Sequence, residues 1–270
     1  MSKFVLSCTT CATRQPELDE ISECFIHAPR AGYKAWGVAG PLFQTPGLMQ
    51  WADYDLLNRR AAEAGLTRCT EVYGRSFPSG SVAEAVAAAR DRVLVFEAAE
   101  KLGSPLVVMT GRQRTPGGME PTIAGIKALL PLIEDKPIRL ALEPHYGSQI
   151  QFLEDYDAIF DEIHSPQVGI TLDSGHFHSA QVDWQRLIKR YSDRIYNFQV
   201  KDHIGTQSVP IGAGEVDLRG YIEALHAIGY EGALAVELEV EDPENLPRYV
   251  AEAYSYLRDL VLDVTGELPE

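Results

Sequence analysis

The sequence predicts an α/β protein with the architecture of a (β/α)8 TIM barrel. Two observations favour this fold. Eight short apolar runs alternate with helical segments, without a linker or a break in composition. Each of the last four runs also ends near a polar side chain that can bind a metal, and a closed parallel barrel gathers its strand ends at one mouth. We therefore expect one domain over residues 1–270.

Length and composition agree with one globular domain. The chain has 270 residues, of which 45% are hydrophobic and 23% charged, as is typical of this barrel and of globular proteins in general. An open doubly wound sheet is the competing architecture. Its usual G-x-G-x-x-G turn after the first strand is missing, because the chain reads CTTCATRQPE there.

The expected strands are mostly continuous apolar runs, as is typical of strands that helices cover on the outside. In order along the chain they are Phe4–Cys8, Tyr33–Val38, Leu66–Tyr73, Leu106–Thr110, Ile138–Glu143, Val168–Asp173, Ile195–Lys201 and Ala233–Glu239.

The segments between the strands carry helix signals, of which three are well marked. Residues 81–84 form a Ser-x-x-Glu capping box before a helix that Gly103 would end. Asp217 can cap a helix that ends near Gly229, and the Asp-Pro-Glu of residues 242–244 is typical of the start of a helix.

The charge and the cysteines exclude several classes of partner and location. A net charge of -15, from 39 acidic and 24 basic residues, would repel a nucleic acid. No apolar stretch approaches membrane-spanning length and the N-terminus does not resemble a signal peptide, so we expect no membrane association and a cytoplasmic location. Four cysteines are too few for a secreted disulfide framework. A homo-oligomer is compatible with the sequence, which does not reveal the oligomeric state.

Three carboxylates and an amide are the candidate metal ligands. They are Glu143, Asp173, Gln199 and Glu237. Successive ligands are separated by about one strand-loop-helix unit, so a barrel would bring them together as hard oxygen ligands for one divalent cation. An unpaired carboxylate in a run such as IRLALEPH would be costly, and a cation removes that cost. A salt bridge to a nearby arginine is the alternative for any one acid alone.

Further candidates stand two to four residues after these ligands, namely His145, His176, Lys201 and His203. Side chains two apart on an extended strand point to the same side. His176 is our first choice for a catalytic role and His145 the second. Lys201 and His203 are candidate substrate contacts, and a structural ion pair with the next residue is the alternative for Lys201.

Two other groups could contact a substrate. Arg112 and Arg114 lie in the loop TGRQRTPGG, which could close over the mouth and bind a carboxylate or phosphate, or could equally be a mobile surface loop. Trp36 and Tyr73 could stack on a sugar ring, although aromatic residues in such places are as often part of the core.

The segments LALEPH, ITLDSGHF, VKDH, PIGAGEVDL and GYEGALAVELE resemble the xylose isomerase-like TIM barrel superfamily. This group includes sugar isomerases and epimerases, hydroxypyruvate isomerase, inosose and 3-dehydroshikimate dehydratases, and endonuclease IV. The resemblance spans nearly the whole chain and is strongest from Glu143 to Glu239. It is specific for the fold and the metal site, and weak for the substrate.

The resemblance implies roles for individual residues. The four ligands of the family fall on Glu143, Asp173, Gln199 and Glu237, with Glu239 as the alternative ligand from the last strand. The histidine that binds a substrate oxygen falls on His176. In the epimerases the first and last glutamates also exchange protons with carbon, which would give those roles to Glu143 and Glu237.

Two departures from the family pattern affect this interpretation. Gln199 stands where most members have histidine, and its neutral oxygen favours Mn²⁺ or Mg²⁺, with Co²⁺ or Zn²⁺ as alternatives, for the single divalent metal ion that we expect. Some dehydroshikimate dehydratase-like members also carry glutamine there. Gly205 stands where ketose 3-epimerases place an arginine, which weakens that assignment.

The sequence therefore predicts a metal-dependent isomerase or epimerase of carbohydrate metabolism. Its substrate would be a small polyhydroxy ketone or aldehyde, and the shared step would be removal of a proton next to the carbonyl to give an enediolate. A dehydratase, which is a lyase, of a cyclic keto-polyol or keto acid such as inosose or 3-dehydroshikimate is the alternative. An endonuclease IV-like phosphodiesterase is disfavoured, because the chain is acidic and lacks the extra histidines of that site.

Overall fold

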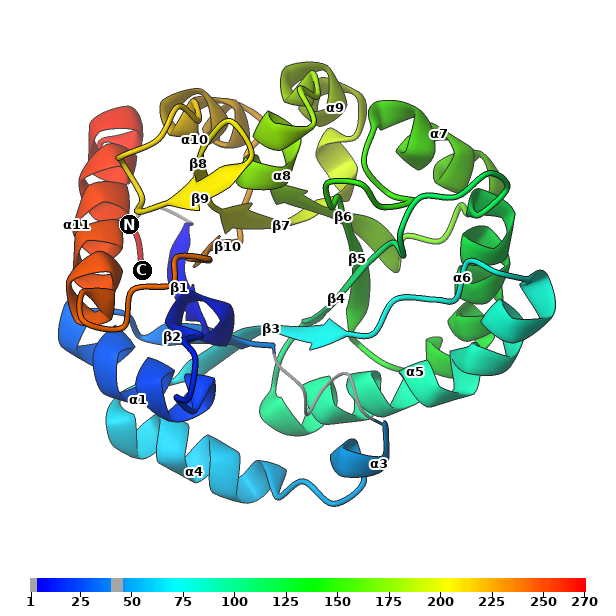
Figure 1. Ribbon diagram of the computed structural model, residues 1–270, viewed down its shortest axis with the longest axis horizontal. Coiled ribbons are helices and arrows are strands. Elements are labelled where there is room, and N and C mark those ends of the chain that lie inside the picture. The colour runs from blue at the N-terminus through cyan, green and yellow to red at the C-terminus, as the bar shows by residue number, and fades with distance from the viewer. Residues whose placement is uncertain (1–3, 40–45) are drawn as a thin grey trace.

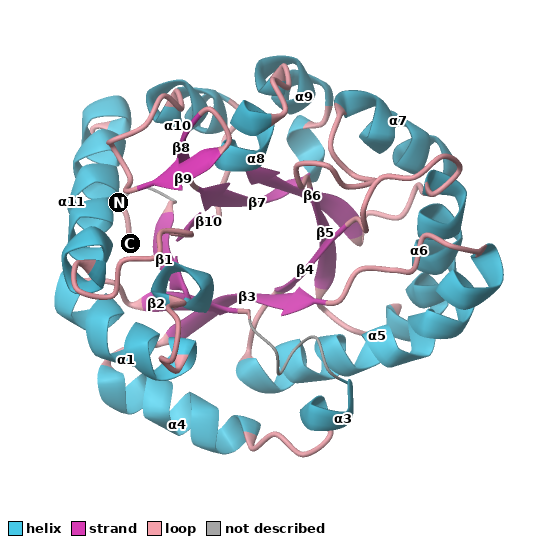
Figure 2. Ribbon diagram, in the orientation of Figure 1, coloured by secondary structure: helices cyan, strands magenta, loops and turns pink. Residues whose placement is uncertain are grey.

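The computed structural model describes residues 4–39 and 46–270. In this part of the chain eight parallel strands close into a barrel in the order β1-β10-β7-β6-β5-β4-β3-β2. Helices surround the ring of strands (Figures 1 and 2), so the predicted TIM barrel is confirmed. The barrel strands are β1 (Val5–Thr9), β2 (Ala35–Val38), β3 (Arg68–Gly74), β4 (Leu106–Thr110), β5 (Arg139–Glu143), β6 (Val168–Asp173), β7 (Ile195–Val200) and β10 (Ala233–Val236).

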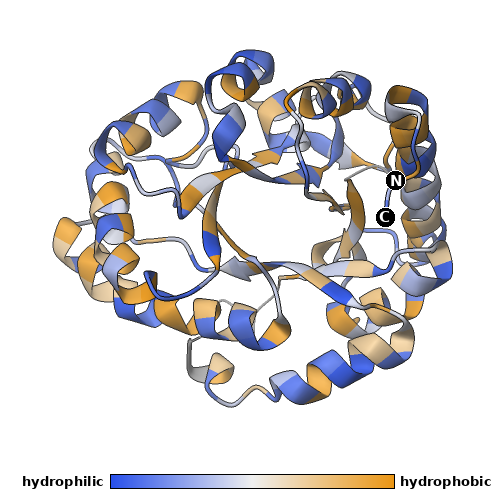
Figure 3. Cartoon of the chain, turned by 180° about the vertical axis from the view of Figure 1, so that it is seen from behind, coloured by the Kyte–Doolittle hydropathy of each residue, from blue (hydrophilic) through white to orange (hydrophobic). Residues whose placement is uncertain are grey.

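The helices follow the strands in alternation and form the outer layer. They are α1 (Glu20–Ala31), α3 (Pro46–Met49), α4 (Tyr54–Ala64), α5 (Val82–Leu102), α6 (Met119–Ile133), α7 (Leu153–Glu162), α8 (Ser174–Ser179), α9 (Trp184–Arg190), α10 (Leu218–Ala227) and α11 (Leu246–Thr265), with short 3-10 turns η1 (Thr10–Thr13) and η2 (Ser192–Arg194). Seen from behind, the strands are mostly hydrophobic or neutral, whereas the helices carry both kinds of residue (Figure 3).

The strands are buried on both faces, as their continuous apolar runs predicted. Every residue of β2, β6 and β10 is buried, because helices cover the outside of the barrel and side chains fill its interior. The ladder sets Asp173 of β6 beside Gln199 of β7, and Gln199 beside Ala235 of β10. The polar ends of β6 and β7 and the residue after β10 therefore meet at the same mouth.

Two of the predicted helix signals act as expected. The Ser81 hydroxyl accepts a hydrogen bond from the Glu84 backbone N–H at 3.2 Å, and Gly103 ends α5 with a φ of 69°. The Asp217 carboxylate accepts from the Gly220 N–H at 2.9 Å at the start of α10.

The start of the last helix differs from the prediction. α11 begins at Leu246 and not at residues 242–244. The Asp242 carboxylate instead accepts hydrogen bonds from the Asn245 side-chain amide at 2.9 Å and from the Tyr249 hydroxyl at 2.8 Å. These bonds hold a turn in front of the helix, which explains why the first turn starts later.

A small antiparallel hairpin follows β7 and was not predicted. It consists of β8 (Asp202–Ile204) and β9 (Gln207–Val209), and Gly205 takes a φ of 60° in its turn. Lys201 lies between β7 and β8, and β10 ends three residues before Glu239, so both barrel strands are shorter than expected. The hairpin lies beside α8 and α10 at the ends of β7 and β10 (Figure 1).

Candidate active site

All four predicted metal ligands lie inside the barrel at its C-terminal mouth. Glu143 and Asp173 end β5 and β6, Gln199 is the last residue but one of β7, and Glu237 follows β10. None of the four is more than 2% exposed. Gln199 reaches Glu71 and Tyr73 of β3 across the barrel, and Glu143 and Glu237 line a cavity at its mouth.

Three of these four side chains carry a buried oxygen without a hydrogen-bond partner. The atoms are Glu143 Oε2, Asp173 Oδ2 and Gln199 Oε1. Such atoms are rare in folded proteins, because burial removes their hydration. Asp173 Oδ2 has the ammonium of Lys201 3.2 Å away as an ionic partner, without the geometry of a hydrogen bond. Three such oxygens from three adjacent strands form a donor set of the hard oxygens that Mn²⁺ and Mg²⁺ prefer. The residues present therefore fit the divalent cation that the resemblance implies.

The two carboxylate oxygens of Asp173 have different surroundings. Oδ1 accepts from the His176 backbone N–H at 2.8 Å and so caps α8. Oδ2 is the atom left without a hydrogen bond. Glu143, Asp173 and His176 each offer one ligand atom, and these three atoms lie within 4.8 Å of one another, which is close enough for a shared ion.

Lys201 places a positive charge among the carboxylates. Its Nζ lies 2.9 Å from Glu237 Oε2, 3.2 Å from Asp173 Oδ2 and 3.4 Å from Glu239 Oε1. Burial alone would lower the pKa of this lysine, but the carboxylates, Asp173 first, outweigh burial and raise its pKa well above the ordinary value. The expected ion pair of Lys201 with Asp202 is not formed, because the Asp202 carboxylate accepts from the backbone N–H groups of Gly212, Gly214 and Val216, and Lys201 instead pairs with carboxylates of the site.

One ammonium does not neutralise the carboxylates around it. Burial raises the pKa of Glu237 to about 7, and it raises the pKa of Glu143 well above its ordinary value, although Lys201 opposes both shifts. The pKa of Glu239, at the more exposed rim, is lowered by Lys201. Both buried glutamates therefore hold a proton more tightly than an exposed carboxylate does, and Glu237, with a pKa of about 7, can gain and lose one near neutral pH.

The histidines differ in their relation to the site. The rings of His145 and His176 are in contact, with centroids 3.8 Å apart and planes tilted by 38°, and His145 is exposed at the mouth. Both ring nitrogens of His176 face donors, with Tyr146 N at 3.4 Å from Nδ1 and Lys201 Nζ at 3.3 Å from Nε2. Burial, followed by Lys201, lowers the pKa of His176 well below its ordinary value, so this ring is neutral at neutral pH.

The expected substrate contact of His203 does not fit its position. Its Nδ1 lies 2.9 Å from the Ser179 hydroxyl, and a Cβ on Gly175 would come within 2.5 Å of its Nε2. The imidazole is thus packed against α8, and it does not line the cavity at the mouth described below. Burial lowers the pKa of His203 as well.

Two further expectations are corrected by the structure. Trp36 is buried, and its ring meets Phe25 of α1 edge to face at 5.0 Å, so it packs between barrel and helix and cannot stack on a sugar. Arg114 pairs with Asp155 and lies over Phe152, so it is a structural residue. Arg112, on the same loop, is exposed and does not line the cavity described next.

A cavity of about 160 Å³ opens over these groups. Glu143, Glu237, Lys201 and His145 line it together with Tyr73, Thr110, Cys11, Arg14, Ala39 and Glu239. The two glutamates with raised pKa values thus reach the same space as the ammonium and an exposed imidazole. A small polar molecule is the kind of ligand that such a cavity accommodates.

Sequence reasoning missed one buried carboxylate, Glu71 of β3. It is fully buried, and its carboxylate accepts hydrogen bonds from the side-chain amides of Asn197 and Gln199. Burial, followed by the charge of Glu237, raises the pKa of Glu71 to about 8. The signal was present in the sequence, because an acidic residue in the middle of the run RCTEVYG is an anomaly for a buried strand.

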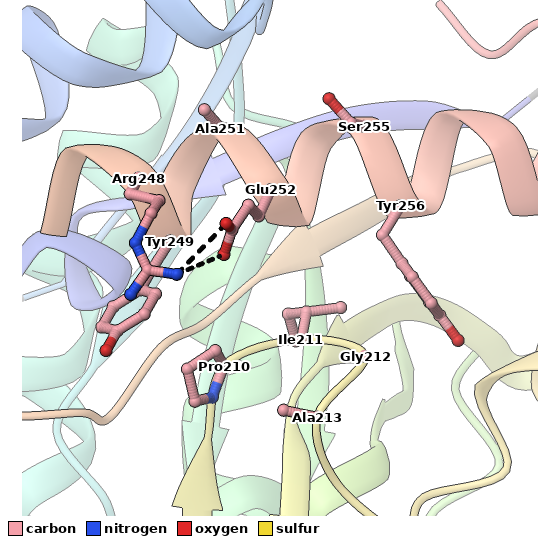
Figure 4. Close-up of a pocket in the computed structure, with 10 residues that line it drawn as sticks. All are labelled: Pro210, Ile211, Gly212, Ala213, Arg248, Tyr249, Ala251, Glu252, Ser255 and Tyr256. Carbon is pink, nitrogen blue, oxygen red and sulfur yellow. Dashed lines mark hydrogen bonds and ion pairs between the residues drawn. The ribbon is translucent and has the colours of Figure 1, made fainter. Parts of the chain in front are cut away.

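A second hollow lies away from this chemistry. It measures about 670 Å³ and separates residues 210–213 from α11 (Figure 4). Its charged residues, Arg248 and Glu252, pair with each other at 3.2 Å. No residue of the candidate active site lines it.

No helix among residues 4–39 and 46–270 is long and apolar enough to cross a membrane.

Comparisons with known proteins agree with this architecture. Residues 25–260 match the family model described as xylose isomerase-like TIM barrel. Among solved structures, an L-ribulose 3-epimerase has a TM-score of 0.76 at 14% identity, covering 98% of this chain and 96% of the other. A D-allulose 3-epimerase from Methylomonas sp., in complex with D-allulose, has a TM-score of 0.75 at 16% identity and covers 96% and 98%.

The curated relatives include dehydratases. The inosose dehydratase of Geobacillus thermodenitrificans is 28% identical over 159 residues, which cover 51% of this chain and 53% of that protein. The chain thus spans about half the length of the curated relatives it matches. Epimerisation and dehydration are the two activities that the sequence led us to expect. The family match covers most of the chain, which therefore belongs to the xylose isomerase-like TIM barrel family.

Proposed function

We propose that this protein is a divalent-metal-dependent isomerase or epimerase of a small polyhydroxy ketone or aldehyde. Glu143, Asp173, Gln199 and Glu237 would hold the cation. The observation that carries the proposal is the set of three buried oxygens without hydrogen-bond partners, which adjoins a cavity lined by two proton-accepting glutamates.

The donor set favours Mn²⁺ or Mg²⁺, with Co²⁺ or Zn²⁺ as alternatives, because it offers oxygens and, at most, one imidazole. A bound cation supplies Lewis-acid polarisation of a substrate carbonyl, which eases loss of the neighbouring proton. Lys201 shares Asp173 and Glu237 with that site and would keep part of their charge balanced.

The proton chemistry is assigned to residues that line the cavity. Glu143 and Glu237 have raised pKa values, so either can take a proton from carbon, and the other can return one from a different direction. His145 stands at the mouth and neutral His176 lies behind it, in positions to bind and orient substrate oxygens. Return to the opposite face would give epimerisation, and return to the neighbouring carbon would give isomerisation.

A dehydratase is the second candidate, supported by the inosose dehydratase relative. It would begin with the same proton removal and would continue with loss of a β-hydroxyl. The presence of Gln199 and of His145 beside His176 is compatible with this chemistry. The substrate panel below distinguishes the two activities by their products.

The experiment is an exchange assay in D₂O. Metal-loaded protein is incubated with a panel of ketoses, inososes and 3-dehydroshikimate, and deuterium at carbon is followed by NMR. We expect exchange with at least one class, lost on chelation and in a Gln199→Ala variant with reduced metal content. Absence of exchange with every substrate, at full metal loading, would contradict the proposal.

A further inference from the structure

The buried carboxylate of Glu71 lies directly beneath the candidate metal site. Its two oxygens accept from different amides, Oε2 from Asn197 Nδ2 and Oε1 from Gln199 Nε2 at 3.3 Å. The barrel makes room for it, because a Cβ at Gly37 would come within 2.6 Å of the Glu71 Cγ. Glycine at position 37 thus lets a charged side chain occupy the interior of the barrel.

The surroundings of Gln199 determine which end of its amide faces the cation site. Nε2 lies within hydrogen-bonding distance of three acceptors, namely Glu71 Oε1, the Tyr73 hydroxyl at 3.0 Å and Glu237 Oε1 at 3.1 Å. The structure fills that place with the donating NH₂ group, whereas an amide oxygen there would be repelled by Glu71 and Glu237 whenever they are ionised. The oxygen therefore points the other way, where it is buried without a partner.

We propose that Glu71, assisted by Tyr73, is a positioning residue that locks the Gln199 amide with its oxygen toward the cation. This inference rests on the proposed metal site. Amide nitrogen does not bind Mn²⁺ or Mg²⁺, so a reversed amide removes one ligand. Glu71 itself does not bind the ion, and it acts only through the orientation of Gln199.

The substitution Glu71→Gln tests whether Glu71 acts through its acceptor oxygens or only fills space. Glutamine has the same shape but only one acceptor oxygen, whereas two amide NH₂ groups point at residue 71. Its own NH₂ must then face one of them. Because the bond from Asn197 is the shorter of the two, the amide that loses its acceptor and is driven to reverse is that of Gln199. Loss of the acceptor opposite Gln199 should weaken Mn²⁺ binding by roughly 10- to 100-fold, as for other residues that orient metal ligands.

The test is a double-mutant cycle of Mn²⁺ affinity, measured by calorimetry and by EPR of free Mn²⁺ on the intact protein. Wild type, Glu71→Gln, Gln199→Ala and the double variant are compared, with circular dichroism to confirm folding. We expect Glu71→Gln to lower the Mn²⁺ affinity strongly in the wild-type background. When Gln199 is already alanine, Glu71→Gln should lower that affinity by less than about twofold, because the effects of coupled residues are not additive.

The outcomes distinguish this inference from the proposed function. If wild type does not bind Mn²⁺, the proposed function fails. If Gln199→Ala weakens binding and Glu71→Gln does not, only the positioning role is overturned. Equal losses from Glu71→Gln with and without Gln199 would also overturn it, since they indicate a general structural effect. Should Glu71→Gln not fold, Tyr73→Phe replaces it in the cycle, and unchanged Mn²⁺ affinity there would contradict the proposal.

Discussion

Replacing Lys201 by methionine removes the one ammonium that the carboxylates of the site share. Methionine keeps much of the length of the side chain, so the change is mainly one of charge. In the metal-free protein, Asp173 and Glu237 would then be buried with their main cationic partner gone, as both are at most 2% exposed.

The cost follows from the burial of these groups. Breaking a buried ion pair by removing one partner lowers the free energy of unfolding by about 3–5 kcal/mol. For a chain of this size that corresponds to a fall in Tm of roughly 6 to 20 °C. The exposed pair Lys127–Glu162 is the matched control, because Lys127→Met removes a solvent-screened surface ion pair and should leave the Tm nearly unchanged.

A divalent cation should reverse much of this loss. The proposed ion binds the same carboxylates that Lys201 neutralises, so Mn²⁺ should stabilise Lys201→Met more than it stabilises wild type. At about 100 times Kd, a ligand adds about 2.7 kcal/mol to the free energy of unfolding. Thermal unfolding followed by circular dichroism, with and without Mn²⁺, measures both effects. The reasoning is refuted if the variant unfolds at the wild-type temperature, or if Mn²⁺ shifts its Tm no more than that of wild type.

Three further predictions follow from the site. Gln199→His should retain the fold and tighten Zn²⁺ relative to Mn²⁺ in competition binding, because imidazole is a better zinc ligand than an amide oxygen; an unchanged preference would mean that Gln199 does not contact the ion. Raising the pH from about 5 to 9 should lower the free energy of unfolding of the metal-free protein, measured in urea. Glu237 (pKa about 7) and Glu71 (pKa about 8) hold protons in the folded state that the unfolded chain releases at lower pH. A rise in the free energy of unfolding over this pH range would contradict those shifts. Metal-replete Glu143→Gln and Glu237→Gln should each lose exchange of the carbon-bound proton. His176→Ala should impair substrate binding or turnover with little effect on metal content. Exchange at the wild-type rate in both glutamate variants would show that another residue is the base.

The strands and the places of the four candidate ligands in the barrel were predictable from the sequence for the same reason. A parallel strand covered on both faces is a continuous apolar run, and an acid or amide near the end of such a run stands out against it. The barrel then brings the four ends together without further information. Lys201 was recognised as a polar neighbour, but its ion pairs depend on distances between strands that spacing along the chain does not give.

The errors have an equally physical origin. In a run such as AWGV no alternation tells which face a side chain takes, so Trp36 could be assigned to the interior although it packs on α1. Glu71 was missed because candidates were sought at strand ends, whereas this acid lies mid-strand and is held by Asn197 and Gln199 from across the barrel. The hairpin at residues 202–209 has strands of three residues each, too short for a hydrophobic period.

The most direct test of the central claim is a crystal structure of the protein with Mn²⁺, located by its anomalous scattering. The account predicts one ion at the mouth of the barrel, coordinated by Glu143, Asp173, Glu237 and the side-chain oxygen of Gln199. An ion bound elsewhere, or an ion at the mouth that leaves Gln199 and Glu143 uncoordinated, would contradict it.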